Sequence, residues 1–153
     1  MWQAIFSATS FVALAAWIIL VFLPRRPFAM ACVLYLGIGL LCLVYTILFV
    51  LVAAGAVDPL RDAGLPPHDF ADLSLAGVRS LFRSEGAVVL GWAHYLAFDL
   101  FVGLWIARDA DAKGFSRVVQ VPVLLATFVA GPLGLFLWLA IRERRARASG
   151  RWE

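Results

Sequence analysis

Residues 2–23 read WQAIFSATSFVALAAWIILVFL, a run of 22 residues without one charged side chain. At about 1.5 Å of rise per residue, a helix of this length crosses a hydrocarbon core of about 30 Å. A cleaved signal peptide is the other interpretation, but the run lacks the basic start and the short apolar centre of such peptides. Pro24, two arginines and Pro27 then end the helix. The sequence therefore predicts a first membrane-spanning helix here.

The rest of the chain repeats this pattern, with long apolar runs between short charged stretches. Of the 153 residues, 63% are hydrophobic and only 15% are charged, and the mean hydropathy is +0.92. These values exclude an ordinary soluble domain. We predict an all-α polytopic membrane protein, a bundle of four transmembrane helices that forms a single domain over residues 1–153. The predicted spans are residues 2–23, 28–57, 87–106 and 118–141, followed by a basic tail at 142–153.

The hydrophilic section between the second and third runs contains an amphipathic pattern. In residues 69–83, apolar side chains fall broadly on one helical face, and Asp72, Arg79 and Arg83 oppose them. This pattern predicts a short helix that lies along the membrane surface. An ordinary cap over the end of the bundle is an equally open alternative.

The positive charges give a weak indication of orientation. An even number of spans places both termini on one side, where the tail supplies five arginines and the long loop three more Lys or Arg residues, against five on the opposite side. The positive-inside rule favours cytoplasmic termini by this narrow margin. Because the usage of Ala, Arg and Val resembles that of bacteria, we expect an integral protein of a bacterial inner membrane.

The third run carries the only acidic side chain inside any predicted span, Asp99. Asp99 and His94 both lie within about 5 Å of the middle of this run. An isolated carboxylate at this depth costs at least about 2.5 kcal/mol, so it needs a partner or a purpose. Tyr95 precedes Asp99 by one helical turn and can form a hydrogen bond with it. His94 points about 140° away from Asp99, onto another face of the helix.

Two interpretations of these polar groups stay open. In the functional one, His94, Tyr95 and Asp99 are catalytic acid and base groups beside an apolar pocket. In the structural one, they form interhelical hydrogen bonds, with Thr127 or the carbonyl of Phe128 as partners. We expect that carbonyl to be free because Pro132 lies inside the fourth run. The candidate ligand-binding residues are Trp92, Phe98, Phe101, Trp105 and Thr127, and the candidate structural residues are Gly131, Pro132 and Gly134.

Residues 92–103, WAHYLAFDLFVG, are followed by Thr127-Phe128 and by Gly131-Pro132-Leu133-Gly134. In these motifs the sequence resembles the neoxanthin-synthase-like family of small membrane proteins, which is named for abscisic acid deficiency. The likeness covers residues 67–142, about half of the chain. The plant member of that family is required for the conversion of violaxanthin into neoxanthin, an isomerisation that opens an epoxide and forms an allene. The resemblance implies a proton donor and a base in an apolar pocket, for which His94 and Asp99 are the candidates.

The function that we predict is to bind or isomerise a carotenoid or another isoprenoid lipid within the membrane. The alternative is a non-catalytic membrane subunit or an assembly factor for a partner enzyme. The expected partners are membrane lipid, the carotenoid or isoprenoid, and a second copy of the chain or a membrane enzyme. We expect no nucleic acid, because the arginines beside the last apolar run suit anionic headgroups better. We also expect no cofactor and no metal, since the third run supplies too few ligands.

Overall fold

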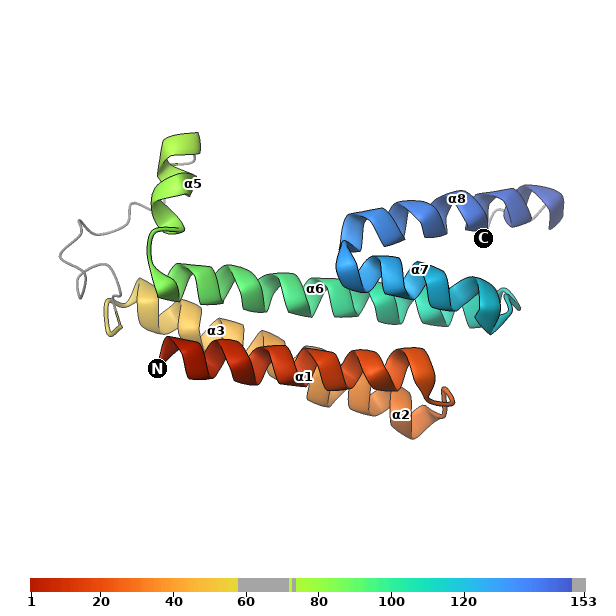
Figure 1. The fold of residues 1–153 in the computed structure, drawn as a ribbon, viewed down its shortest axis with the longest axis horizontal. Helices are drawn as coiled ribbons and strands as arrows, with labels where there is room; N and C mark the ends of the chain where they lie inside the picture. Colours follow the sequence, from red (N-terminus) through yellow and green to blue (C-terminus); the bar gives the residue numbers. More distant parts are fainter. Residues whose placement is uncertain (58–71, 73, 150–153) are drawn as a thin grey trace.

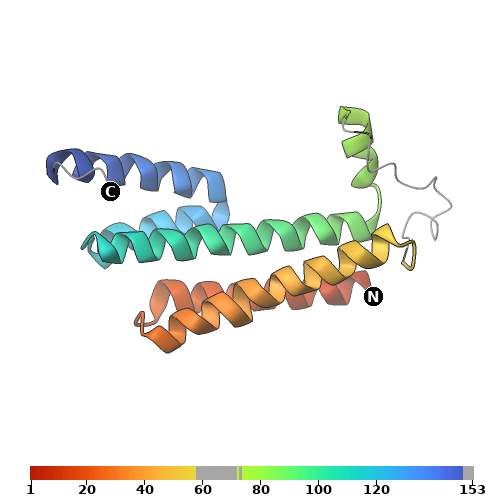
Figure 2. The ribbon, with the colours of Figure 1, turned by 180° about the vertical axis from the view of Figure 1, so that it is seen from behind.

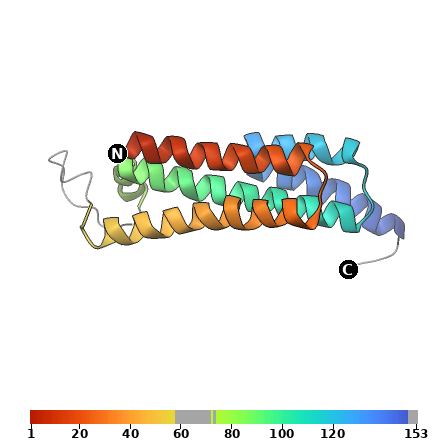
Figure 3. The ribbon, with the colours of Figure 1, turned by 90° about the horizontal axis from the view of Figure 1, so that it is seen from below.

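The computed structural model describes residues 1–57, 72 and 74–149, with the side chains of 144–149 left out. This part of the chain is helical and contains no strand, so the all-α prediction is confirmed. Its body consists of three long apolar helices: α1 (Trp2–Phe22), a second helix over Pro27–Ala53, and α6 (Glu85–Ala112). Each is long and apolar enough to cross a membrane. Figure 3 shows the three running beside one another.

The second long helix changes its winding along its length. It begins as α2 (Pro27–Ala31), continues as η1 (Cys32–Gly39), which has the wider turns of a π-helix, and ends as α3 (Leu40–Ala53). Gly37 of η1 lies where three helices meet. A Cβ atom there would come within 2.8 Å of the Cβ of Ala16 and 3.0 Å of a methyl group of Leu100. The bare glycine therefore lets α1, η1 and α6 pack closely.

The fourth apolar run differs from the prediction, because it forms two helices instead of one. Helix α7 (Arg117–Val129) runs back along α6, the chain turns at Ala130, and α8 (Gly131–Ser149) returns to the end where α7 began (Figures 1 and 2). At about 20 Å, α7 is too short to cross a bilayer. The single helix expected at 118–141 is therefore replaced by a helical hairpin that turns halfway along α6.

The physical reason for this break lies just before the proline. Ala130 is extended, with φ −153° and ψ 90°, and Pro132 occupies the first turn of α8. A proline fits there at no cost, since the first amides of a helix have no partner within it. The prediction that Pro132 lies inside a continuous helix was therefore wrong.

The hairpin also changes where the chain ends. Figure 1 shows the start of α1 at one end of the bundle and the end of α8 at the other. The start of α1 and the end of α8 thus lie at opposite ends of the bundle, whereas four crossings would bring the two termini to one side.

Only part of the expected surface helix lies within the described residues. Helix α5 (Leu75–Leu81) begins at Ser74, whose hydroxyl accepts a hydrogen bond of 3.1 Å from the amide of Gly77. The hydroxyl and amide of Ser74 both hydrogen-bond to Asp72 and lower the pKa of that carboxyl. Residues 58–71 and 73 lie outside the described part. The placement of residues 69–83 on a membrane surface stays a prediction.

Candidate functional site

The buried carboxylate of Asp99 meets the turn of the hairpin. The Asp99 side chain lies in the middle of α6, is only 8% exposed, and accepts hydrogen bonds from the backbone N–H of Gly131 and from the hydroxyl of Tyr95. Gly131 is the first residue of α8. Asp99 therefore caps the start of α8 from a neighbouring helix, where a negative charge also suits the helix dipole.

The close fit at this contact depends on Gly131. A Cβ atom on that residue would overlap the carboxylate of Asp99. The second carboxylate oxygen, Oδ2, is buried and has no hydrogen-bond partner among the described residues. One carboxylate oxygen of Asp99 thus contacts Gly131 in the turn, and the other is an unused hydrogen-bond acceptor.

Tyr95 links the carboxylate to the last residue of α7. Its hydroxyl lies 3.3 Å from the carbonyl oxygen of Val129, in addition to its hydrogen bond with Asp99. Because a phenol has one proton, it donates to one of these oxygens at a time. Tyr95 thus interacts with Asp99, one helical turn away, and its hydrogen bond with Val129 joins α6 to the break between α7 and α8.

The structure does not bring His94 to Asp99. His94 lies on the outer surface of the bundle, where its ring stacks on Phe98 with centroids 4.5 Å apart and approaches Tyr45 at 5.8 Å. Phe98, Phe101 and Trp105 share this outward face and are 57%, 52% and 38% exposed. We call these four side chains the outer aromatic face. Three of the candidate ligand-binding residues thus lie together, but on the side of α6 away from Asp99.

Thr127 is placed by the contact between α7 and α8. It is fully buried, and its hydroxyl donates a 2.8 Å hydrogen bond to the carbonyl of Val123 in its own helix. A Cβ atom on Gly134 would overlap Thr127, so the two residues mark the closest approach of the hairpin's arms. Thr127 and Gly134 therefore hold the hairpin together and do not reach Asp99 in any contact that the structure shows.

The fifth candidate ligand-binding residue, Trp92, lies on the same side of α6 as Tyr95 and Asp99. Its ring stacks on Phe6 of α1 with centroids 5.3 Å apart, and it approaches Tyr95 at 5.4 Å. Its indole N–H donates a 2.9 Å hydrogen bond to the hydroxyl of Ser10. We call Phe6, Trp92 and Tyr95 the aromatic ladder. The ladder runs along the seam between α1 and α6 and ends at Asp99.

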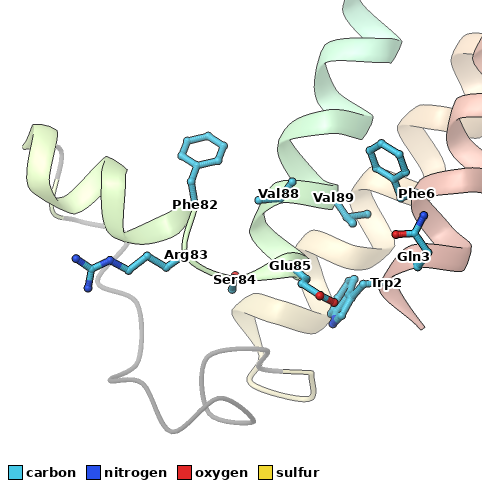
Figure 4. Close-up of a pocket in the computed structure, with 9 residues that line it drawn as sticks. All are labelled: Trp2, Gln3, Phe6, Phe82, Arg83, Ser84, Glu85, Val88 and Val89. Carbon is cyan, nitrogen blue, oxygen red and sulfur yellow. The ribbon is translucent and has the colours of Figure 1, made fainter.

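The other end of the ladder reaches a pocket at the start of α6 (Figure 4). This end pocket has a volume of about 310 Å³, and its walls come from the start of α1, the end of α5 and the first turns of α6. Phe6 belongs to both the pocket and the ladder. The remaining lining residues are Trp2, Gln3, Phe82, Arg83, Ser84, Glu85, Val88 and Val89.

Sequence reasoning missed the end pocket, because no local pattern marks it. Phe82 follows α5 and lies against Gly91 of α6, where a Cβ atom would come within 3.2 Å of the phenylalanine ring. Ser84 starts α6 by accepting a 3.1 Å hydrogen bond from the amide of Ala87. The pocket appears only when α1 is placed beside this turn.

The polar groups of the site do not form a metal centre. Among the described residues, no three His, Cys, Asp or Glu side chains gather closely enough to hold an ion. Proton transfer and hydrogen bonding are the chemistry that Tyr95 and Asp99 themselves can supply.

Comparison with known proteins places the chain in a family. A family model described as ABA DEFICIENT 4-like matches residues 4–138, which include the ladder, Asp99 and the hairpin turn. No curated protein and no solved structure matches the chain. The chain therefore belongs to the ABA DEFICIENT 4-like family, which confirms the neoxanthin-synthase-like resemblance and supports a carotenoid-related role.

Proposed function

We propose that this protein binds a carotenoid or another isoprenoid lipid along the aromatic ladder, between the end pocket and Asp99. The observation that supports the proposal is an unbroken series of side-chain contacts from the end pocket to Asp99. Phe6 lines the pocket and stacks on Trp92, Trp92 approaches Tyr95, and Tyr95 hydrogen-bonds to Asp99. An apolar, aromatic path with polar groups at both ends matches a long polyene with oxygenated ends.

The length of the path supports a chain-like ligand. From Glu85 to Asp99, α6 rises about 21 Å, which accommodates several isoprene units. Gln3 and Glu85 offer hydrogen bonds to a polar end group in the pocket. Trp92 and Tyr95 are half-buried, so a ligand reaches their rings from the surrounding lipid. In this proposal α5 lies along the membrane surface beside the pocket, as the amphipathic pattern predicted.

Tyr95 and Asp99 give the path a candidate acid and base. Tyr95 is the more accessible of the two and stays hydrogen-bonded to the carboxylate behind it. Protonation of an epoxide oxygen opens its C–O bond, and removal of a proton from a carbon of the chain forms the new double bond. One proton is given and one is taken, so this isomerisation needs no other reactant.

Ligand extraction from two filled-pocket variants tests the binding step. Val88→Trp fills the end pocket, whereas Val44→Trp fills an apolar groove of about 270 Å³ between α1 and α3 that no part of the ladder touches. The proteins are purified from a host that makes carotenoids, and their lipids are identified by mass spectrometry. We expect Val88→Trp to lose the isoprenoid and Val44→Trp to keep it. Equal ligand content in both variants would contradict the proposal.

A second pair of variants tests the chemical step separately. Asp99→Asn removes the carboxylate and Tyr95→Phe removes the phenol hydroxyl, while both variants nearly keep the shape of the side chain. Each variant therefore lacks one member of the candidate acid–base pair. If the protein isomerises its ligand, the bound pigment stays and the ratio of isomers in the cell shifts toward the substrate. Unchanged isomer ratios in folded, pigment-bound variants would leave binding as the function and remove catalysis.

The outer aromatic face favours one alternative, a membrane subunit that steadies a partner enzyme. His94 exposes a polar ring among apolar side chains at a depth where lipid offers it no hydrogen bond. A partner helix would satisfy it. A photoreactive amino acid in place of Phe101 then crosslinks to a protein, whereas crosslinks to lipid alone would argue against this alternative.

A further inference from the structure

The opposite end of the bundle holds a buried arginine at the turn between α1 and α2. The side chain of Arg25 is only 7% exposed. Its Nη1 donates to Asp111 Oδ1 at 2.7 Å and to the carbonyl of Ala107 at 2.9 Å, both near the end of α6. Arg25 therefore joins the loop between α1 and α2 to the C-terminal end of α6.

These contacts leave most of the guanidinium unused. Nε and Nη2 of Arg25 are buried and have no hydrogen-bond acceptor among the described residues, and the same holds for Nη1 of Arg117. The other terminal nitrogen of Arg117 donates to the carbonyl of Leu23, two residues before Arg25 in the chain. A guanidinium stays charged at any pH that proteins meet, so these buried N–H donors keep their protons although they have no acceptor.

The charges at this end do not balance either. Arg25 and Arg117 lie close enough to repel each other, and Asp111 compensates for one of the two positive charges. Asp111 is also shared, because Gln120 donates a 3.0 Å hydrogen bond to the same oxygen. One positive charge and three nitrogen atoms that bear N–H groups thus remain without an acceptor in the part of the chain that the structure describes.

We propose that Arg25 and Arg117 together bind a phosphate group at this end of the bundle. A phosphate offers several acceptor oxygens and a negative charge, and a guanidinium fork recognises it with two parallel hydrogen bonds. The side chain of Asp111 is 44% exposed, so the cluster lies next to the surface. The first turn of α7 adds unpaired amides, because Ser116 makes no side-chain capping bond among the described residues.

The position of the cluster suggests where the phosphate comes from. Arg25 follows the end of α1 and Arg117 begins α7, so both lie where a bilayer places its headgroups. A phospholipid headgroup and a soluble phosphate or diphosphate share the required chemistry. The test therefore has one arm for each source.

Two substitutions and one control separate a phosphate site from a structural ion pair. Arg25→Lys keeps a charge for Asp111 but removes the fork, and Arg117→Gln removes the second donor. Arg26→Gln changes the exposed neighbour and is the matched control. Native mass spectrometry of detergent-solubilised protein with phosphatidylglycerol, against phosphatidylcholine, measures lipid binding. We expect wild type and Arg26→Gln to bind phosphatidylglycerol about tenfold more tightly than the two site variants.

The second arm uses lipid-free protein and measures the melting temperature with inorganic phosphate or diphosphate. A stabilisation that Arg25→Lys and Arg117→Gln both lose, without selective lipid binding, assigns the site to a soluble phosphate. Binding of both probes that is equal in all variants, or no binding of either probe by the wild type, overturns the proposal. If Arg25→Lys fails to fold, Arg117→Gln alone decides, since Arg117 is half-exposed.

Discussion

At the scale of single residues, Asp99 shows why a chain carries a carboxylate in the middle of a membrane helix. The turn at Ala130 exposes the first amides of α8 at a depth where lipid offers no acceptor. Asp99 supplies one, through its contact with Gly131. Asp99 thus reaches another helix through Gly131, a residue that the structural interpretation did not name, and its free oxygen leaves the functional interpretation open as well.

The first prediction concerns Gly131. Gly131→Ala places a methyl group against the carboxylate of Asp99, so we expect the free energy of unfolding to fall by about 1–3 kcal/mol. Gly39→Ala is the control, because its new Cβ atom meets its nearest neighbour, the carbonyl of Leu34, at 3.4 Å. Thermal unfolding in detergent measures both. Similar melting temperatures for the two variants would show that the turn is not closely packed.

The second prediction separates charge from capping at Asp99. Asp99→Asn keeps a side-chain oxygen for the amide of Gly131, whereas Asp99→Leu leaves that amide without an acceptor. We expect Asp99→Leu to be less stable than Asp99→Asn by about 1–3 kcal/mol. The same unfolding assay measures the difference. A leucine variant as stable as the asparagine variant would contradict the capping role.

At the scale of elements, Asp109 fastens the returning arm of the hairpin to α6. Its carboxylate accepts hydrogen bonds from the indole of Trp138 at 3.0 Å and from Arg142 at 2.9 Å. Lys113 approaches the other oxygen at 3.3 Å. Trp138 is fully buried and packs edge-on against Phe115 at 5.0 Å. The hairpin is thus held at both ends, by Asp99 at its turn and by Asp109 at its base.

The third prediction follows from this attachment. Asp109→Ala removes the acceptor of Trp138 and Arg142, so we expect α8 to exchange its amide hydrogens faster while α1 stays protected. Arg108→Ala, an exposed neighbour on the same turn, is the control. Hydrogen exchange followed by mass spectrometry resolves the two helices. Unchanged exchange in α8 would mean that packing alone holds the hairpin.

How far the sequence predicts the structure differs from element to element. The three long helices follow from the length of the apolar runs in the sequence. The contact of Tyr95 with Asp99 follows from their spacing of one helical turn. The hairpin does not follow, because residues 118–141 are as long and apolar as a true span, and Pro132 reads equally well as a kink. The structure also sets the turn against Asp99, and Asp99 and Gly131 lie far apart in the chain. The end pocket likewise requires α1 to be placed beside α6.

At the scale of the whole molecule, the hairpin redistributes the positive charge. Of the described residues, the end that holds the start of α1 carries two arginines, Arg79 in α5 and Arg83 just after it. The opposite end carries nine Lys or Arg residues within the described part, from the turn after α1, the turn between α6 and α7, and α8. The narrow margin that four crossings gave thus becomes a wide one, and by the positive-inside rule we propose that the Arg25 end faces the cytoplasm.

The fourth prediction is that the two ends of the chain lie on opposite faces of the membrane. In a background without Cys32 and Cys42, single cysteines before Trp2 and at Gly114 are labelled with an impermeant thiol reagent in intact cells. Gly114 has a φ of 66°, so it lies in a tight exposed turn that reports on the Arg25 end. We expect labelling of the first site only. Labelling of both sites, or of Gly114→Cys alone, would contradict this orientation.

The most direct test of the account compares two aromatic side chains on opposite faces of α6. Trp92 belongs to the aromatic ladder, and Phe101 lies on the outer aromatic face. Trp92→Ala and Phe101→Ala are purified from a carotenoid-producing host, and the bound pigment is measured by its absorbance relative to protein. The account predicts that Trp92→Ala loses the pigment and Phe101→Ala keeps it. Loss in Phe101→Ala with retention in Trp92→Ala would contradict a ligand site on the inner side of α6.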